Sequence, residues 1–285
     1  MEDGGAMLDF FLILLLSHLL TDFVFQTDAM VACKYGTGNK ARMALSLHAG
    51  IFFITSLSLS LIIQGVHWFT WFNLLIVLLL SLSHYVVDLL KGKIINSAYT
   101  FYTFDLNGTG SGIQVNFGYP NWLFWADQFA HLVFISVFTI AAFHTAITWE
   151  LIPARELLNN LLPVVKPFSA LQKTLIFSCI LIFITSFANI IIKKSLKATK
   201  LQITSSGKEL IAGRYIGAFE RILTVIAIVA GAYEAIAILF ASKTAIRFSQ
   251  IQGSAEFRDY YILGTLISVF LGVLGGIFAR LIFYQ

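Results

Sequence analysis

Histidine and aspartate occur in pairs, four residues apart, within three strongly apolar stretches of this sequence. The pairs are His18 with Asp22, His84 with Asp88 and, in reversed order, Asp127 with His131. A fourth histidine, His48, stands in "SLHAG" near the start of another apolar stretch. Residues four apart share one face of a helix, so each pair can act on one ion or one substrate. Ionisable groups are costly in apolar surroundings and tend to mark function there.

These residue types favour a metal site. Imidazole nitrogen and carboxylate oxygen are the usual ligands of zinc and also suit iron or manganese. One helix can supply two ligands, or a ligand and the group that orients it. Seven candidates exceed the four of a tetrahedral site, so we expect either two ions or one ion with an open position, which catalysis requires. The candidate metal ligands are His18, Asp22, His48, His84, Asp88, Asp127 and His131.

The composition predicts the elements that must position these residues. Of 285 residues, 58% are hydrophobic and only 12% are charged, whereas soluble domains carry about 25% charged residues. Apolar runs near the spanning length of ~20 residues recur along the chain. We therefore expect an all-α, multi-pass membrane protein. The net charge of +4 reflects loop topology rather than nucleic-acid binding.

The hydropathy pattern predicts about seven membrane spans. They are Met7–Phe25, Ala44–Ile63, Trp68–Leu90, Trp122–Ile147, Leu171–Ile192, Ile216–Ala241 and Tyr260–Phe283. Lysine and arginine residues follow spans one, three and five, for example Lys34, Lys91 and Lys193. By the positive-inside rule, the N-terminus faces out and the C-terminus faces in. All seven candidate ligands then fall at a similar depth, near the cytoplasmic face.

The chain is expected to contain two membrane domains. Residues 1–150 form a four-helix domain that carries the His/Asp cluster and an aromatic, glycine-rich insert at 92–120. That insert could be a β-hairpin, a re-entrant loop or a lid. Residues 151–285 form a three-helix domain with a basic cytoplasmic loop at 193–208, which is itself a candidate boundary.

The second domain carries signals for close helix packing and one charged pair. The glycine pairs Gly213/Gly217 and Gly272/Gly276 are each spaced four apart, which permits close helix approach. In "GRYIGAFER", Glu220 and Arg221 fall at the inner side of span six. An ion pair that orients helices is the preferred interpretation of Glu220. Alternatively, these residues could be accessory to the His/Asp site, with Glu220 as a proton acceptor.

Several of these motifs together resemble a known family. "SHLLTDFVFQTDAMVACK", "LHA", "SHYVVDLLK" and "DQFAHL" resemble the uncharacterised bacterial inner-membrane proteins grouped as domain of unknown function 3307. The resemblance covers about Leu8–Phe143, and "GRYIGAFERILTVIAIVAGAYEAIAILFASKTAIRF" resembles the C-terminal half of longer members. It implies location in the cell inner membrane and no established activity. More loosely, the arrangement resembles membrane-bound metal-dependent hydrolases, a likeness that does not by itself give function.

The first functional hypothesis is that the protein is an integral-membrane hydrolase that uses one or two divalent metal ions, with zinc as the favoured metal. It would act from the cytoplasmic side on a lipid, a lipid-linked phosphoester or a membrane peptide. Asp22 is assigned as the proton acceptor, although the sequence gives Asp22 and Asp88 equivalent surroundings. The alternatives are a metal-ion or proton transporter or channel, and a non-catalytic sensor or scaffold with a structural metal. The partners considered are the bilayer, anionic lipid or a protein at 193–208, and a second copy in a homo-oligomer.

Overall fold

The chain forms two compact units, Met1–Lys166 and Pro167–Gln285. The structure is a computed structural model. It describes residues 3–68, 70–98, 102–104, 113–115, 121–144, 167–199 and 207–284.

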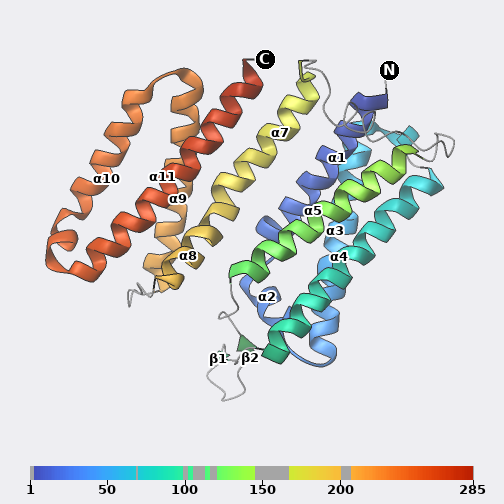
Figure 1. Cartoon of the computed structure of the whole chain (residues 1–285), viewed down its shortest axis with the longest axis horizontal. Coiled ribbons are helices and arrows are strands. Elements are labelled where there is room, and N and C mark those ends of the chain that lie inside the picture. Colours follow the sequence, from blue (N-terminus) through green and yellow to red (C-terminus); the bar gives the residue numbers. More distant parts are fainter. Residues whose placement is uncertain are drawn as a thin grey trace. The chain divides into compact units, whose positions relative to one another are not determined.

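The first unit is a bundle of four long helices (Figure 1). Its elements are α1 (Asp3–Leu20), the π-helical turn η1 (Thr21–Phe25), α2 (Asp28–Lys34), α3 (Asn39–Gln64), the 3-10 turn η2 (Val66–Trp68), α4 (Trp71–Ala98), β1 (Tyr102–Phe104), β2 (Ile113–Val115) and α5 (Asn121–His144). Helix α1 packs against α3 and α5, and α4 packs against the same two helices. The four helices therefore enclose a common interior.

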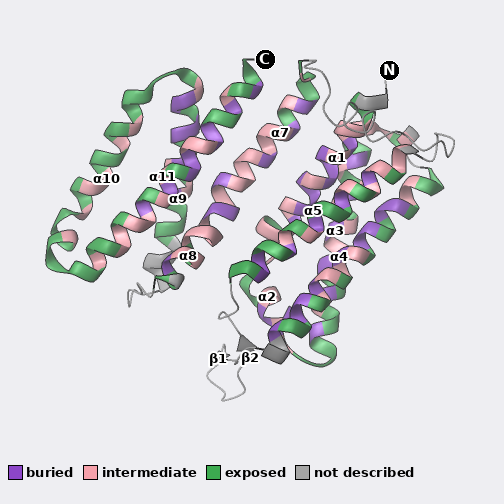
Figure 2. Cartoon of the chain, viewed as in Figure 1, coloured by how far each residue is buried: buried purple, intermediate pink, exposed green. Residues whose placement is uncertain are grey.

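The interior of this bundle is apolar over much of its length. One cluster of buried side chains joins all four long helices: Phe10, Leu14, Phe52, Ile76, Val77, Leu80 and Ile135. Large apolar side chains also cover the outer faces, where Ile54, Leu82 and Val137 are exposed (Figure 2). Such an outer surface suits hydrocarbon rather than water.

The insert after the third span contains a short antiparallel hairpin. Helix α4 continues to Ala98, beyond the expected end of the span at Leu90. Strands β1 and β2 pair so that Tyr102 lies opposite Val115 and Phe104 opposite Ile113. Residues 92–98 of the insert thus belong to α4, and the two described strands form the β-hairpin that was one of its three alternatives. The "GTGSG" run at 108–112 lies outside the described residues.

The second unit contains four helical rods. They are the continuous rod of α7 (Ala170–Ile182), the π-helical turn η3 (Phe183–Phe187) and α8 (Ala188–Ala198), followed by α9 (Gly207–Ala230), α10 (Tyr233–Gly253) and α11 (Ala255–Phe283). Ser169 opens α7 with a capping box to Gln172, which satisfies two free backbone N–H groups. Lys193 and Lys197 of the expected basic loop instead lie near the end of the first rod.

Helix α11 packs closely on its neighbours through glycine. A Cβ atom at Gly276 would lie 2.6 Å from a methyl carbon of Ile228, and one at Gly275 would lie 2.5 Å from Ile184. The packing role of the Gly272/Gly276 pair is therefore confirmed. The same expectation for Gly213 is wrong, because no described atom lies within 4 Å of a Cβ placed there.

Six helices of the described residues are long and apolar enough to cross a membrane. They are Gly5–Phe25, Asn39–Gln64, Trp71–Ile95, Asn121–Phe143, Ala170–Lys197 and Ala255–Phe283. The chain is thus an all-α, multi-pass membrane protein apart from its short hairpin, as predicted.

The expected span Ile216–Ala241 is wrong as a single helix. Gly231 takes a left-handed φ of 74° and separates α9 from α10. The backbone N–H of Ala232 returns to the carbonyl of Ala227 at 2.8 Å, a helix-ending arrangement that glycine favours. Apolar residues continue through this turn, so hydropathy alone does not detect it.

Candidate metal centre

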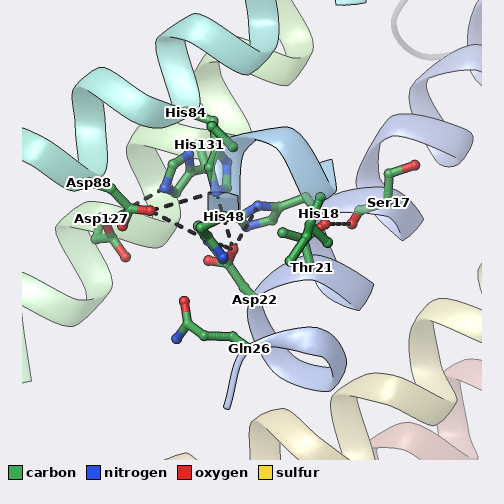
Figure 3. A network of polar contacts seen from close by, with 12 residues as sticks. Ser17, His18, Thr21, Asp22, Gln26, His48, His84, Asp88, Asp127 and His131 are labelled. Carbon is green, nitrogen blue, oxygen red and sulfur yellow. Dashed lines mark hydrogen bonds and ion pairs between the residues drawn. The ribbon is translucent and has the colours of Figure 1, made fainter. Parts of the chain in front are cut away.

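The four helices of the first unit bring all seven candidate ligands into one cluster (Figure 3). Helix α1 supplies His18 and the turn η1 supplies Asp22. Helix α3 supplies His48, α4 supplies His84 and Asp88, and α5 supplies Asp127 and His131. Every one of these side chains is at most 9% exposed. The cluster is therefore built into the bundle interior.

The imidazole rings face one another. The ring centroids of His84 and His131 lie 4.2 Å apart, and those of His18 and His131 lie 4.8 Å apart. His18 Nδ1, His84 Nε2 and His131 Nε2 are buried without a hydrogen-bond partner. Carboxylate oxygens of Asp22 and Asp127 lie 3.3–3.9 Å from these nitrogens. One ligand atom from each of these histidines lies within 4.8 Å of the others.

Asp22 is held among the histidines. Its Oδ1 lies 3.1 Å from His48 Nε2, 3.3 Å from His84 Nε2 and 3.9 Å from His18 Nδ1. Two further ligand groups include it, one with His48 and His84 and the other with Asp127 and His131.

The π-helical turn η1 places Asp22 at this position. Two hydroxyls, Ser17 in the preceding turn and Thr21 at the start of η1, bond backwards along the helix. Ser17 Oγ donates to the Ile13 carbonyl and Thr21 Oγ1 donates to the Ser17 carbonyl, both at 2.8 Å. Such hydroxyl bonds compete with the regular backbone ladder. π-Turns inside α-helices are frequent at functional sites.

Two lysines belong to the cluster, and the sequence analysis did not assign them to it. Lys34 Nζ donates to Asp88 Oδ2 and Lys91 Nζ donates to Asp127 Oδ2, each at 2.6 Å. Both lysines are buried. Charge balance could have revealed them, because three carboxylates in apolar sequence require nearby cations.

The predicted orientation of the termini counts Lys34 and Lys91 as cations of cytoplasmic loops. The structure shows that both side chains are buried and ion-paired, so neither counts as a loop charge. The orientation of the termini stays a prediction that depends on the other cations.

The lysines also give the three aspartates different ion-pair partners. Asp88 and Asp127 each have an ammonium partner, whereas the ion pairs that Asp22 forms with described residues are with histidines. The sequence left Asp22 and Asp88 equivalent, and the structure distinguishes them.

Two glutamine side chains line one side of the cluster. Gln128 Oε1 lies 3.4 Å from His18 Nε2, and its amide nitrogen donates to Asp127 Oδ2 at 3.1 Å. Gln26 accepts from Lys34 Nζ at 2.8 Å. Gln26 and Gln128 are partly buried, whereas the four histidines are buried.

Glu220 and Arg221 have partners within the second unit. Glu220 forms an ion pair with Lys243, so the ion-pair interpretation of Glu220 is confirmed. Arg221 donates to Ser268 Oγ at 2.8 Å and to Asn189 Oδ1 at 2.6 Å. Their proposed accessory role at the His/Asp site stays a prediction.

Comparison with known proteins identifies the first unit. The sequence model of a family described as a protein of unknown function (DUF3307) matches residues 10–159, which is more than half of the chain. The chain belongs to this family. The DUF3307 region contains the seven predicted ligands and both buried lysines. No curated protein and no solved structure matches the chain.

Proposed function

We propose that this DUF3307 protein is an integral-membrane, metal-dependent hydrolase. One observation carries the proposal: His18, His84 and His131 are buried, and one ring nitrogen of each lies within 4.8 Å of the others. Three protein ligands leave the fourth position of a zinc ion open for water or substrate. Zinc is the first choice of metal because the donors are imidazoles.

The residues around this site have separate proposed roles. A bound divalent ion would lower the pKa of its water to about 7 and polarise the scissile group. Asp22 is the proposed proton acceptor, because it touches the three-histidine group and its ion pairs among the described residues are with histidines. His48 positions Asp22 through its contact at 3.1 Å. Asp127 Oδ1 lies 3.6 Å from His131 Nε2.

The surroundings favour a substrate that is present in the membrane. The cluster lies within helices long and apolar enough to span a bilayer. A lipid, a lipid-linked phosphoester or a membrane peptide could approach past the half-buried Gln26 and Gln128. We propose action from the cytoplasmic side of the cell inner membrane. The lid role predicted for the insert at 92–120 falls mostly on residues outside the described ranges.

A hydrolysis assay in mixed micelles tests this function. Purified protein is loaded with zinc and offered a fluorogenic phosphodiester, a carboxylic ester and a membrane peptide. We expect turnover of one class, its loss with chelator, and its loss in Asp22→Asn. Asp259→Asn removes an exposed carboxylate, 56% exposed, in the second unit and serves as the matched control with full activity. Absence of turnover for all three classes by metal-loaded protein would argue against a hydrolase.

Transport of protons or metal ions is the second candidate, and one observation favours it. Ser56, Ser60 and Gln64 continue at four-residue intervals along the α3 face that carries His48, about 12–24 Å beyond it. Their side-chain oxygens, and that of Thr139 on α5, are buried without a partner. These polar residues come further along α3 and α5 from the His/Asp cluster than the buried apolar residues Phe52 and Ile135. Metal or proton flux in liposomes that His84→Ala abolishes would rank transport above hydrolysis.

A further inference from the structure

The two buried lysines occupy positions where a metal ion could otherwise bind. Lys34 Nζ lies 2.6 Å from Asp88 Oδ2 and 2.8 Å from Gln26 Oε1. His48 Nε2 is 3.4 Å from the same Asp88 oxygen. A carboxylate, an amide oxygen and an imidazole are all metal ligands, but the ammonium group fills the space among them.

Lys91 has a corresponding place beside Asp127. Its Nζ lies 2.6 Å from Asp127 Oδ2 and 5.5 Å from the centre of the Tyr35 ring. The aromatic face stabilises the ammonium charge, and Tyr35 is itself buried. The lysine is therefore a fixed part of the cluster.

One divalent ion then leaves the cluster with a smaller net charge than two divalent ions would. With neutral histidines, three carboxylates and two ammonium groups leave a single negative charge. One divalent ion would change this to a single positive charge. A second would raise it to three positive charges in the bundle interior, where unbalanced charge is costly.

We infer that the cluster binds one divalent ion per chain, and that Lys34 and Lys91 take the charge-compensating places that a second ion would occupy. This inference rests on the proposed metal centre and specifies its stoichiometry. Asp88 and Asp127 are then positioning residues, held by the lysines, rather than ligands of a second ion.

Metal stoichiometry of purified variants tests the inference. Wild-type protein, Lys34→Met and Lys34→Arg are incubated with excess zinc, freed of unbound metal by gel filtration, and measured by elemental analysis. We expect one ion per chain in wild-type protein and in Lys34→Arg, which retains the positive charge. Lys34→Met exposes the oxygens of Asp88 and Gln26 and should bind two. Lys91→Met provides a second, independent variant at Asp127.

A matched control is Lys243→Met, which removes the lysine of the Glu220 ion pair in the second unit and should leave one ion. Two ions in wild-type protein, or one ion in both folded Lys→Met variants, would overturn the inference and leave the proposed metal centre intact. No ion in wild-type protein would instead overturn the metal centre itself. Size-exclusion profiles establish which variants are folded.

Discussion

The two units both bury strongly polar groups beside a π-helical turn, but they satisfy them differently. In the second unit, η3 presents the carbonyls of Ile184 and Thr185, which accept hydrogen bonds from Arg221. Asn189 and Ser268 accept from the same guanidinium. In the first unit, η1 places Asp22 among histidines whose ring nitrogens include unpartnered ones.

This difference separates a structural site from a candidate functional one. A buried group whose hydrogen bonds are made within the protein ties helices together. A cluster with several buried nitrogens that make no hydrogen bond is a candidate for ligand binding. Changes at Arg221 should therefore alter stability, and changes in the His/Asp cluster should alter ligand binding.

The largest expected effect is the loss of metal from His84→Ala. This change removes one of the three proposed nitrogen ligands, so bound zinc should fall to near zero. Turnover should fall by at least about 100-fold, since even the loss of an outer-shell partner costs roughly 10–100-fold. Elemental analysis and the micelle assay measure the two quantities. Zinc retained at the wild-type level would remove His84 from the site.

Arg221→Met should destabilise the second unit without affecting metal binding. The change leaves two backbone carbonyls and the Asn189 oxygen without their donor, at a cost of about 3–5 kcal/mol in the free energy of unfolding. Chemical denaturation in mixed micelles measures this. Loss of zinc from folded Arg221→Met would contradict the separation between the two regions.

Gly276→Ala should cost about 1–3 kcal/mol in the free energy of unfolding through overpacking. The added methyl group would meet Ile228 at 2.6 Å. Gly213→Ala is the matched control, because the space around Gly213 is open and alanine favours a helix. The control should be neutral or slightly stabilising in the same denaturation experiment. Equal effects at both glycines would refute the packing argument.

The smallest effect is expected for Lys243→Met. Its ion pair with Glu220 is partly exposed, with side chains 23% and 17% exposed, and such pairs contribute about 0–1 kcal/mol. The unfolding midpoint in denaturant should therefore shift only slightly. A destabilisation comparable to that of Arg221→Met would mean that this pair is structurally essential.

The location of the site could be predicted from the sequence because it depends on local spacing. Four-residue intervals place His18 with Asp22 and His84 with Asp88 on single helix faces, and hydropathy places those helices in a membrane. The contribution of Lys34 was missed because it follows a span as a loop cation would. Its burial depends on how α2 packs beside α4, which is a tertiary property.

The break at Gly231 could not be predicted for a related reason. Apolar residues flank it on both sides, so the hydropathy window continues through the turn. Only the backbone conformation, with a positive φ at Gly231, divides α9 from α10. A lone glycine is tolerated within many helices, and the sequence does not distinguish the two cases.

X-ray absorption spectroscopy of the zinc-loaded protein tests the central claim most directly. The account predicts a zinc edge whose first shell contains three imidazole nitrogens, with one imidazole fewer in any zinc that remains bound to His18→Ala. A first shell without imidazole, or zinc-treated protein that retains no zinc, would contradict a metal centre in this cluster.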